Sequence, residues 1–136
     1  HARSDAQRNL TEHGREQVRQ AAAHLIGQSI DTMLVSPYVR AQQTAEIVRK
    51  VLGGTPALKT VPWLTPESDP ACAVGQLPDN GNVLLVSHQP FVGELISLLQ
   101  YGHYRSPEPM QTASLAQLEG DGALAGCMHL RTVRHP

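Results

Sequence analysis

The sequence lacks an excess of charge of either sign. Lys and Arg together number 11, Asp and Glu 12, and the net charge is −1. Because nucleic-acid binding depends largely on positive charge, this balance disfavours a nucleic-acid partner. Long hydrophobic runs are also missing, which disfavours a membrane-spanning helix and a signal-peptide core. We therefore expect neither a nucleic acid nor a membrane among the partners of this protein.

Cysteine is nearly absent. The two cysteines, Cys72 and Cys127, lie far apart in the sequence, so they are too few for a disulfide scaffold and wrongly spaced for a structural zinc site. We expect no metal and no cofactor, and the expected compartment is the reducing cytoplasm. The sequence also lacks the Gly-x-x-x-x-Gly-Lys loop, the Gly-x-Ser-x-Gly elbow and the Gly-x-Gly-x-x-Gly turn, which argues against the enzyme classes that they define.

The chain does contain short apolar runs that alternate with amphipathic stretches over 136 residues, a length typical of one domain. The pattern predicts a buried strand at residues 32–35 and further strands at 59–61, where Pro62 ends the run, and at 82–87. It predicts helices at about 12–26, 38–52, 69–76 and 90–100, and a hairpin from residue 114 onward. Residues 1–9 are polar and are predicted to form a loop.

This alternation indicates an α/β fold, a three-layer α/β/α sandwich with a mostly parallel sheet and a C-terminal hairpin that adds an antiparallel edge strand. We expect residues 1–136 to form a single domain. Parallel sheets of this kind bind ligands at the carboxyl ends of their strands. The chemistry is therefore expected directly after Val35 and Val86.

Two residues at these strand ends are candidate site residues. Arg40 falls in the opening turn of a predicted helix, where free N–H groups and the guanidinium together favour an anion. His88 follows the second strand, where an imidazole can donate to an oxyanion or transfer protons. Taken singly, each is more often an ordinary residue, Arg40 on the surface and His88 in a structural hydrogen bond. Their joint placement favours a phosphate or carboxylate site.

Three segments resemble the histidine phosphatase superfamily, which includes phosphoglycerate mutase-like enzymes, and within it the small SixA-type phosphohistidine phosphatases. Residues 10–17 (LTEHGREQ) are similar to that family's Leu-Thr-x-x-Gly-x-x-Gln helix start. Residues 36–45 (SPYVRAQQTA) resemble its Ser-Pro-x-x-Arg-Ala-x-Gln-Thr-Ala segment, and residues 86–90 (VSHQP) resemble its second-histidine segment. The order and spacing fit across nearly the whole chain, and the middle segment is the most specific.

The resemblance implies roles for the matched residues. Arg40 corresponds to the second phosphate-clamping arginine, and His88 to the histidine that stabilises the transferring phosphoryl group. Ser36, Ser87 and Gln89 are expected to bind phosphate or to shape the loops. The family's nucleophilic histidine and first arginine belong to an Arg-His-Gly motif, which is absent from this sequence. We expect that motif, with a first strand, upstream of His1.

The short interval between Arg40 and His88, 88 − 40 = 48 positions, implies a family member without a cap domain. Thr65 and Pro66 stand about where the acidic proton donor of capped members is expected; Glu67 and Asp69 are nearby acids whose more ordinary role is in a solvated loop. A site without a dedicated acid suits a phosphohistidine substrate, because imidazole leaves more readily than an alkoxide and needs less proton assistance. An open site can also admit a side chain on a protein surface.

The expected function is therefore that of a phosphohistidine phosphatase that acts through a phosphohistidine enzyme intermediate. Its expected partner is a phosphohistidine-bearing phosphotransfer protein, its product is inorganic phosphate, and it is expected to be a monomer. Two alternatives stay open: a phosphatase for small phosphomonoesters, and a non-catalytic phosphate-binding or protein-interaction module.

Overall fold

The central layer of the protein is a three-stranded parallel sheet. The computed structural model describes residues 4–136. Strand β1 (Thr32–Val35) lies in the middle, with β2 (Ala57–Thr60) on one side and β3 (Val83–Val86) on the other. Val35 is level with Thr60 and Val86, so the three strands end together. This shared edge is the one at which the candidate site residues were predicted.

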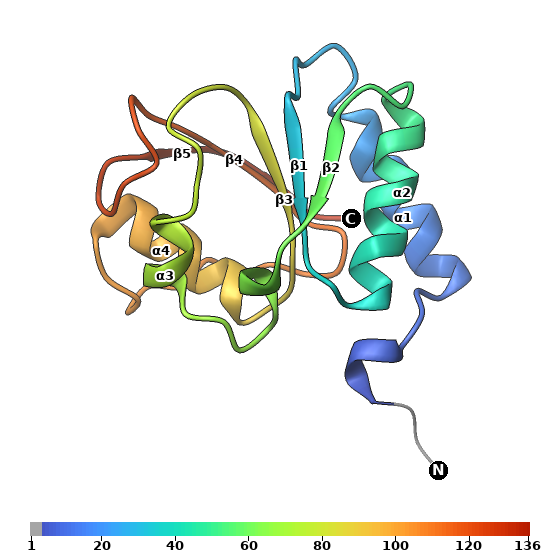
Figure 1. Cartoon of the computed structure of the whole chain (residues 1–136), viewed down its shortest axis with the longest axis horizontal. Coiled ribbons are helices and arrows are strands. Elements are labelled where there is room, and N and C mark those ends of the chain that lie inside the picture. The colour runs from blue at the N-terminus through green and yellow to red at the C-terminus, as the bar shows by residue number, and fades with distance from the viewer. Residues whose placement is uncertain (1–3) are drawn as a thin grey trace.

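Helices cover both faces of this sheet (Figure 1). On one face, α1 (Glu12–Ala23) and α2 (Val39–Val51) pack against the strands, and on the other lie α3 (Pro70–Val74) and α4 (Phe91–Tyr101). Short 3-10 helices, η1 (Asp5–Gln7) and η2 (Pro62–Leu64), precede α1 and α3. The predicted three-layer α/β/α architecture with a mostly parallel sheet is confirmed.

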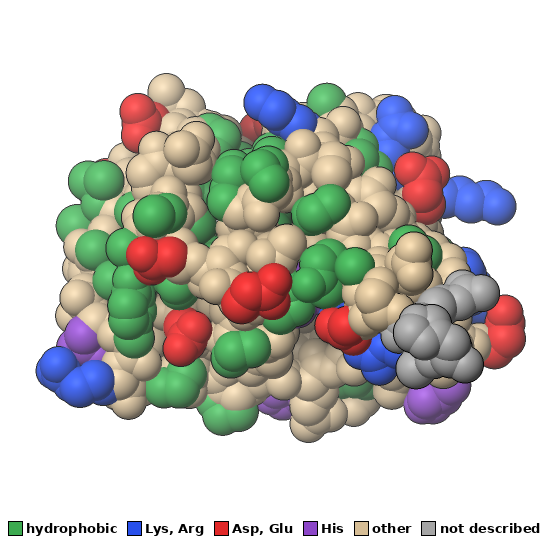
Figure 2. Space-filling model, turned by 60° about the horizontal axis from the view of Figure 1, so that its bottom comes forward, with side chains coloured by type: hydrophobic (Ala, Val, Ile, Leu, Met, Phe, Trp, Pro, Cys, Tyr) green, Lys and Arg blue, Asp and Glu red, His purple; other side chains and the backbone are tan. Residues whose placement is uncertain are grey.

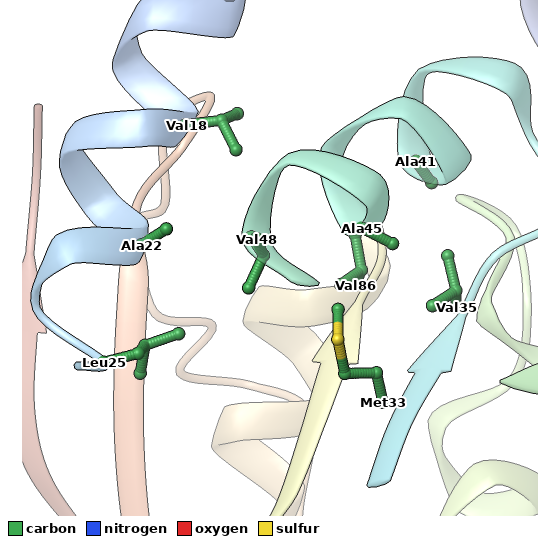
Figure 3. Packing of buried hydrophobic residues seen from close by; sticks show 9 residues of the cluster. All are labelled: Val18, Ala22, Leu25, Met33, Val35, Ala41, Ala45, Val48 and Val86. Carbon is green, nitrogen blue, oxygen red and sulfur yellow. The ribbon is translucent and has the colours of Figure 1, made fainter. Parts of the chain in front are cut away.

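Side chains of β1 alternate between two buried clusters, as the two-residue period of a strand requires. Met33 and Val35 pack with α1 and α2, whereas Leu34 packs with η2, α3 and α4. Figure 3 shows the first cluster, in which Ala22 of α1 and Ala45 of α2 lie among larger side chains such as Met33. The second cluster centres on Phe91, which is fully buried.

The helix boundaries follow from local chemistry. Thr11 caps α1 because its Oγ1 accepts a hydrogen bond of 3.0 Å from the Gly14 N–H. The helix ends at Ala23, three residues earlier than predicted, because its last turn tightens: the His24 N–H donates to the Ala21 carbonyl at 3.1 Å. Gly27, with φ of 90°, then reverses the chain into β1.

The predicted C-terminal hairpin is present, with β4 (Leu115–Glu119) antiparallel to β5 (His129–Arg134). It forms a sheet of its own, so the expected antiparallel edge strand of the parallel sheet is not seen among residues 4–136. The hairpin is instead attached to α4: the Met128 N–H donates to the Leu99 carbonyl at 2.9 Å, and Leu118 and Met128 pack on the second cluster.

The predicted loop at residues 1–9 is wrong at residues 5–7, which form η1, and residues 1–3 lie outside the described part of the chain. No helix within residues 4–136 is long and apolar enough to cross a membrane.

Candidate active site

His88 lies directly after β3, at the edge where the parallel strands end. Only 9% of its surface is exposed, and its Nε2 lies 2.7 Å from the Ser36 Oγ at the end of β1. The Tyr38 ring packs against the imidazole, with 4.9 Å between ring centroids. Burial lowers the pKa of His88 from its ordinary value of 6.5 to about 4, with a further contribution from the positive charge of Arg40. The imidazole is therefore neutral at neutral pH.

Arg40 lies in the first turn of α2, close to the same edge. Its guanidinium is 5.2 Å from the centroid of the Tyr38 ring, so this one aromatic side chain contacts both Arg40 and His88. The two predicted site residues are thus brought together, although 48 positions (88 − 40) separate them in the sequence. The free N–H groups of the α2 N-terminus and the Arg40 cation make the surroundings of Arg40 electropositive.

An anionic group already binds to Arg40. The guanidinium donates from Nη1 to the Asp5 backbone carbonyl at 2.8 Å and from Nη2 to the Asp5 Oδ2 at 3.1 Å. The other carboxylate oxygen accepts from Arg8 at 2.8 Å, so Asp5 bridges two arginines. Desolvation alone would raise the pKa of Asp5, but the hydrogen bonds and charges of Arg40 and Arg8 outweigh it and lower that pKa. Arg40 and Arg8 therefore stabilise a carboxylate in its ionised form.

The three further predicted site residues have different surroundings. Ser36 is fully buried and contacts the imidazole of His88. The Ser87 hydroxyl donates to the Leu64 carbonyl at 2.6 Å, away from the ring. The Gln89 Oε1 accepts from the Gly93 N–H at 2.7 Å, and its amide nitrogen donates to the carbonyls of Glu108 (3.4 Å) and Met110 (3.5 Å). Ser87 and Gln89 therefore hold the loops, and Ser36 alone of the three contacts a candidate catalytic side chain.

Sequence reasoning missed Asp5, Arg8 and Tyr38. Asp5 and Arg8 reach the site because Gln43 of α2 holds the segment that follows η1: its Oε1 accepts from the Leu10 N–H at 2.8 Å, and its Nε2 donates to the Asn9 Oδ1 at 2.7 Å. No periodicity marks such a contact between a loop and a distant helix. The one available signal for a charged contact was Arg8, which stands in the polar segment just before residues 10–14 (LTEHG).

The two acids considered as proton donors differ in their roles. Asp69 caps α3 by accepting from the Ala71 N–H at 3.0 Å and also accepts from the Tyr104 hydroxyl at 2.9 Å. These hydrogen bonds lower its pKa, so it is ionised and unsuited to donate a proton near neutral pH. Glu67 accepts from the Tyr38 hydroxyl at 3.4 Å, which links it to the aromatic ring beside His88.

The positive character of the site is local. Charged side chains of both signs are scattered over the face at the carboxyl ends of the strands, without a broad basic surface (Figure 2). Within residues 4–136, no group of three or more His, Cys, Asp or Glu side chains is arranged to hold a metal ion. A groove of about 840 Å³ lies beside α1 and α2, outside the site.

Comparison with known proteins agrees with this geometry. Residues 2–64 match the histidine phosphatase superfamily (branch 1). A phosphohistidine phosphatase SixA homolog of Haemophilus influenzae is 37% identical over 135 residues, covering 89% of this chain and 81% of that protein. The chain belongs to the histidine phosphatase superfamily. Phosphohistidine phosphatase SixA of Escherichia coli is 35% identical over 127 residues, covering 88% of this chain and 78% of its own.

A solved structure of the superfamily, the protein histidine phosphatase SixA complexed with tungstate, has the same fold. It superposes with a TM-score of 0.88 at 32% identity, covering 99% of this chain and 88% of that chain. The fold and the order of the three motif segments therefore agree with a SixA-type histidine phosphatase.

Proposed function

We propose that this protein is a phosphohistidine phosphatase: it hydrolyses the phosphorus–nitrogen bond of a phosphohistidine on a protein and releases inorganic phosphate. The observation that carries the proposal is the binding of the Asp5 carboxylate by Arg40 beside the buried His88. A phosphoryl group, like a carboxylate, presents oxygens that a guanidinium fork can bind. The names of the SixA relatives support phosphohistidine as the substrate.

Arg40 and His88 have complementary roles in this proposal. Phosphoryl transfer leaves negative charge on three equatorial oxygens, and catalysis consists mainly of positioning the group and stabilising that charge. Arg40 supplies the positive charge, whereas neutral His88 supplies one directed hydrogen-bond donor. Arg8, which shares Asp5 with Arg40, adds a second cation nearby. Residues 4–136 do not include the nucleophilic histidine and first arginine of the family's Arg-His-Gly motif.

The surroundings of the site favour a protein-borne substrate. The chain between Arg40 and His88 is taken up by the rest of α2, by β2, η2, α3 and β3 and by their loops, so it provides no cap over the site. A side chain on a protein surface can approach such an open edge. Residues 4–136 contain two clusters that share the strands of one sheet, which supports the proposal of a single domain.

The test is the release of phosphate from a phosphohistidine-bearing protein, measured beside a panel of sugar and nucleotide phosphates. We expect the phosphohistidine to be hydrolysed preferentially, and Arg40→Ala and His88→Ala each to slow the reaction by about 10²–10³-fold, the usual loss for one preorganised donor. The matched control is Arg131→Ala, since Arg131 is an exposed arginine of β5 paired with Glu119 at 2.8 Å. It should leave the rate unchanged.

Three results would contradict the proposal. Faster hydrolysis of the phosphomonoesters would favour the small-molecule alternative. Binding of phosphate without any hydrolysis would favour the non-catalytic module. Equal rates for wild type and His88→Ala would remove His88 from the site.

A further inference from the structure

The hydroxyl of Ser36 has a defined set of hydrogen bonds. Ser36 is fully buried, and its Oγ accepts from the Tyr38 N–H at 3.2 Å and lies 2.7 Å from the Nε2 of His88. A serine hydroxyl carries one hydrogen and can accept two hydrogen bonds. The bond to His88 can therefore have either group as its donor, and the rest of the network decides which.

If His88 donated from Nε2, the hydroxyl would accept twice, and its own hydrogen would need another acceptor. No such acceptor is present within residues 4–136, where the Ser36 Oγ has only the two partners named above. A buried donor left without a partner costs about 1–3 kcal/mol. If Ser36 donates to Nε2, both groups are satisfied. The network therefore selects Ser36 as the donor and leaves Nε2 of His88 without a proton.

The ring proton of neutral His88 must then be on Nδ1, because the hydrogen bond at one ring nitrogen sets the state of the other. Within residues 4–136, every buried side-chain nitrogen or oxygen has a hydrogen-bond partner. Nδ1 has no partner among these residues, so it is not one of the fully buried atoms. The N–H of this tautomer is therefore available to an incoming ligand.

Ser36 itself is held rigidly. Its N–H donates to the Val86 carbonyl at 3.0 Å, and its carbonyl accepts from the Gln42 side chain at 2.9 Å. These bonds tie the residue to β3 and to α2, so the position of its hydroxyl is fixed before any ligand binds. A donor held in this way can impose one tautomer on the ring beside it.

We propose that Ser36 is a positioning residue: its hydroxyl donates to Nε2 of His88 and so keeps the ring proton on Nδ1, from which it is donated to a phosphoryl oxygen. The assignment of the tautomer rests on the hydrogen bonds alone. Its use in binding a phosphoryl group rests on the proposed function.

The first experiment is a measurement of the ¹⁵N chemical shifts of the His88 ring in the wild-type protein at pH 7. We expect the pattern of a neutral ring protonated at Nδ1. The variant Ser36→Ala should convert it to the Nε2-protonated form or to a mixture. A ring protonated at Nε2 in the wild type would overturn the proposal, and so would an unchanged pattern in Ser36→Ala.

The matched control is Ser87→Ala. Ser87 directly precedes His88, but its hydroxyl donates to the Leu64 carbonyl, so its removal leaves the contact between Ser36 and the ring intact. Its ring shifts should equal those of the wild type. Inorganic phosphate then serves as the ligand: its dissociation constant should rise about 10–100-fold in Ser36→Ala, the loss expected when one hydrogen bond to a charged group is no longer made. Ser87→Ala should bind phosphate as the wild type does.

The two measurements separate the proposals. An Nδ1-protonated ring that depends on Ser36, in a wild-type protein that binds no phosphate, would contradict the proposed function and leave the tautomer assignment standing. Normal phosphate binding with an Nε2-protonated ring would contradict the role of Ser36 and leave the function standing.

Discussion

Acidification should destabilise this protein through His88 in particular. Its pKa is about 4 in the folded state, mainly because the ring is buried, and 6.5 is the ordinary value expected in the unfolded chain. Between these two pH values the unfolded state binds the additional proton, so stability falls as the pH falls from 6.5 toward 4. The contribution of the neutral ring is therefore fully present above pH 6.5 and lost at low pH.

The size of the effect follows from the two pKa values. Their difference is 6.5 − 4, about 2.5, and at about 1.36 kcal/mol for each pH unit the full loss is about 3 kcal/mol. About 2 kcal/mol of it should be lost between pH 7 and pH 5. Because His88 is only 9% exposed, solvent screening reduces this value little.

The assay is urea unfolding of the wild type and of His88→Gln at several pH values between 7 and 4. Glutamine keeps polar atoms near the Ser36 hydroxyl but cannot be protonated in this range. All other groups titrate in both proteins, so the difference between their unfolding free energies isolates His88. A difference that stays constant from pH 7 to pH 4 would refute the reasoning, since it would mean that His88 has the same pKa folded and unfolded.

Three further substitutions test other parts of the structure. Asp5→Asn removes the carboxylate charge that competes with phosphate for Arg40, so inorganic phosphate should bind up to about fivefold more tightly, as measured by calorimetry. Weaker binding would show that Asp5 instead holds the guanidinium in place. Thr11→Ala removes the α1 cap and should lower the unfolding free energy in urea by about 1 kcal/mol, whereas Thr55→Ala, at an exposed hydroxyl, should not. Gly93→Ala would place a Cβ 2.6 Å from the Glu108 carbonyl oxygen and should lower the free energy of unfolding, measured by thermal unfolding, by about 1–3 kcal/mol. The control is Gly122→Ala, whose Cβ would lie 3.9 Å from Leu124 and should be tolerated.

The elements of the fold were predictable because their signals are local. The buried run at residues 32–35 has the apolar character of a central parallel strand, and β1 has these bounds. Asp69 followed by Pro70 predicted the start of α3, and the carboxylate of Asp69 does cap it. The place of the hairpin was not predictable, because its attachment to α4 depends on a backbone hydrogen bond from Met128 to Leu99 and not on a sequence pattern.

The candidate site was predictable only in part. Arg40 and His88 could be placed together because parallel strands end at one edge of a sheet. The bridge from Asp5 to Arg40 spans 35 positions and starts in a segment without periodicity, so no pattern of the sequence predicts this contact. The role of the Ser36 hydroxyl was equally hidden, since a serine that binds phosphate and a serine that orients an imidazole look the same in a sequence.

The low pKa of His88 and the arrangement around Arg40 have a common physical consequence. A protonated His88 would be buried close to a permanent cation, and both burial and that charge oppose it. In the site without a phosphoryl group His88 is therefore neutral near neutral pH, and the positive charge available to such a group comes from arginine. Asp5 balances the arginines while no other anion is bound. A ligand must then replace the Asp5 carboxylate at Arg40, and a group with more negative charge than one carboxylate is favoured in that exchange because Arg40 and Arg8 attract it more strongly.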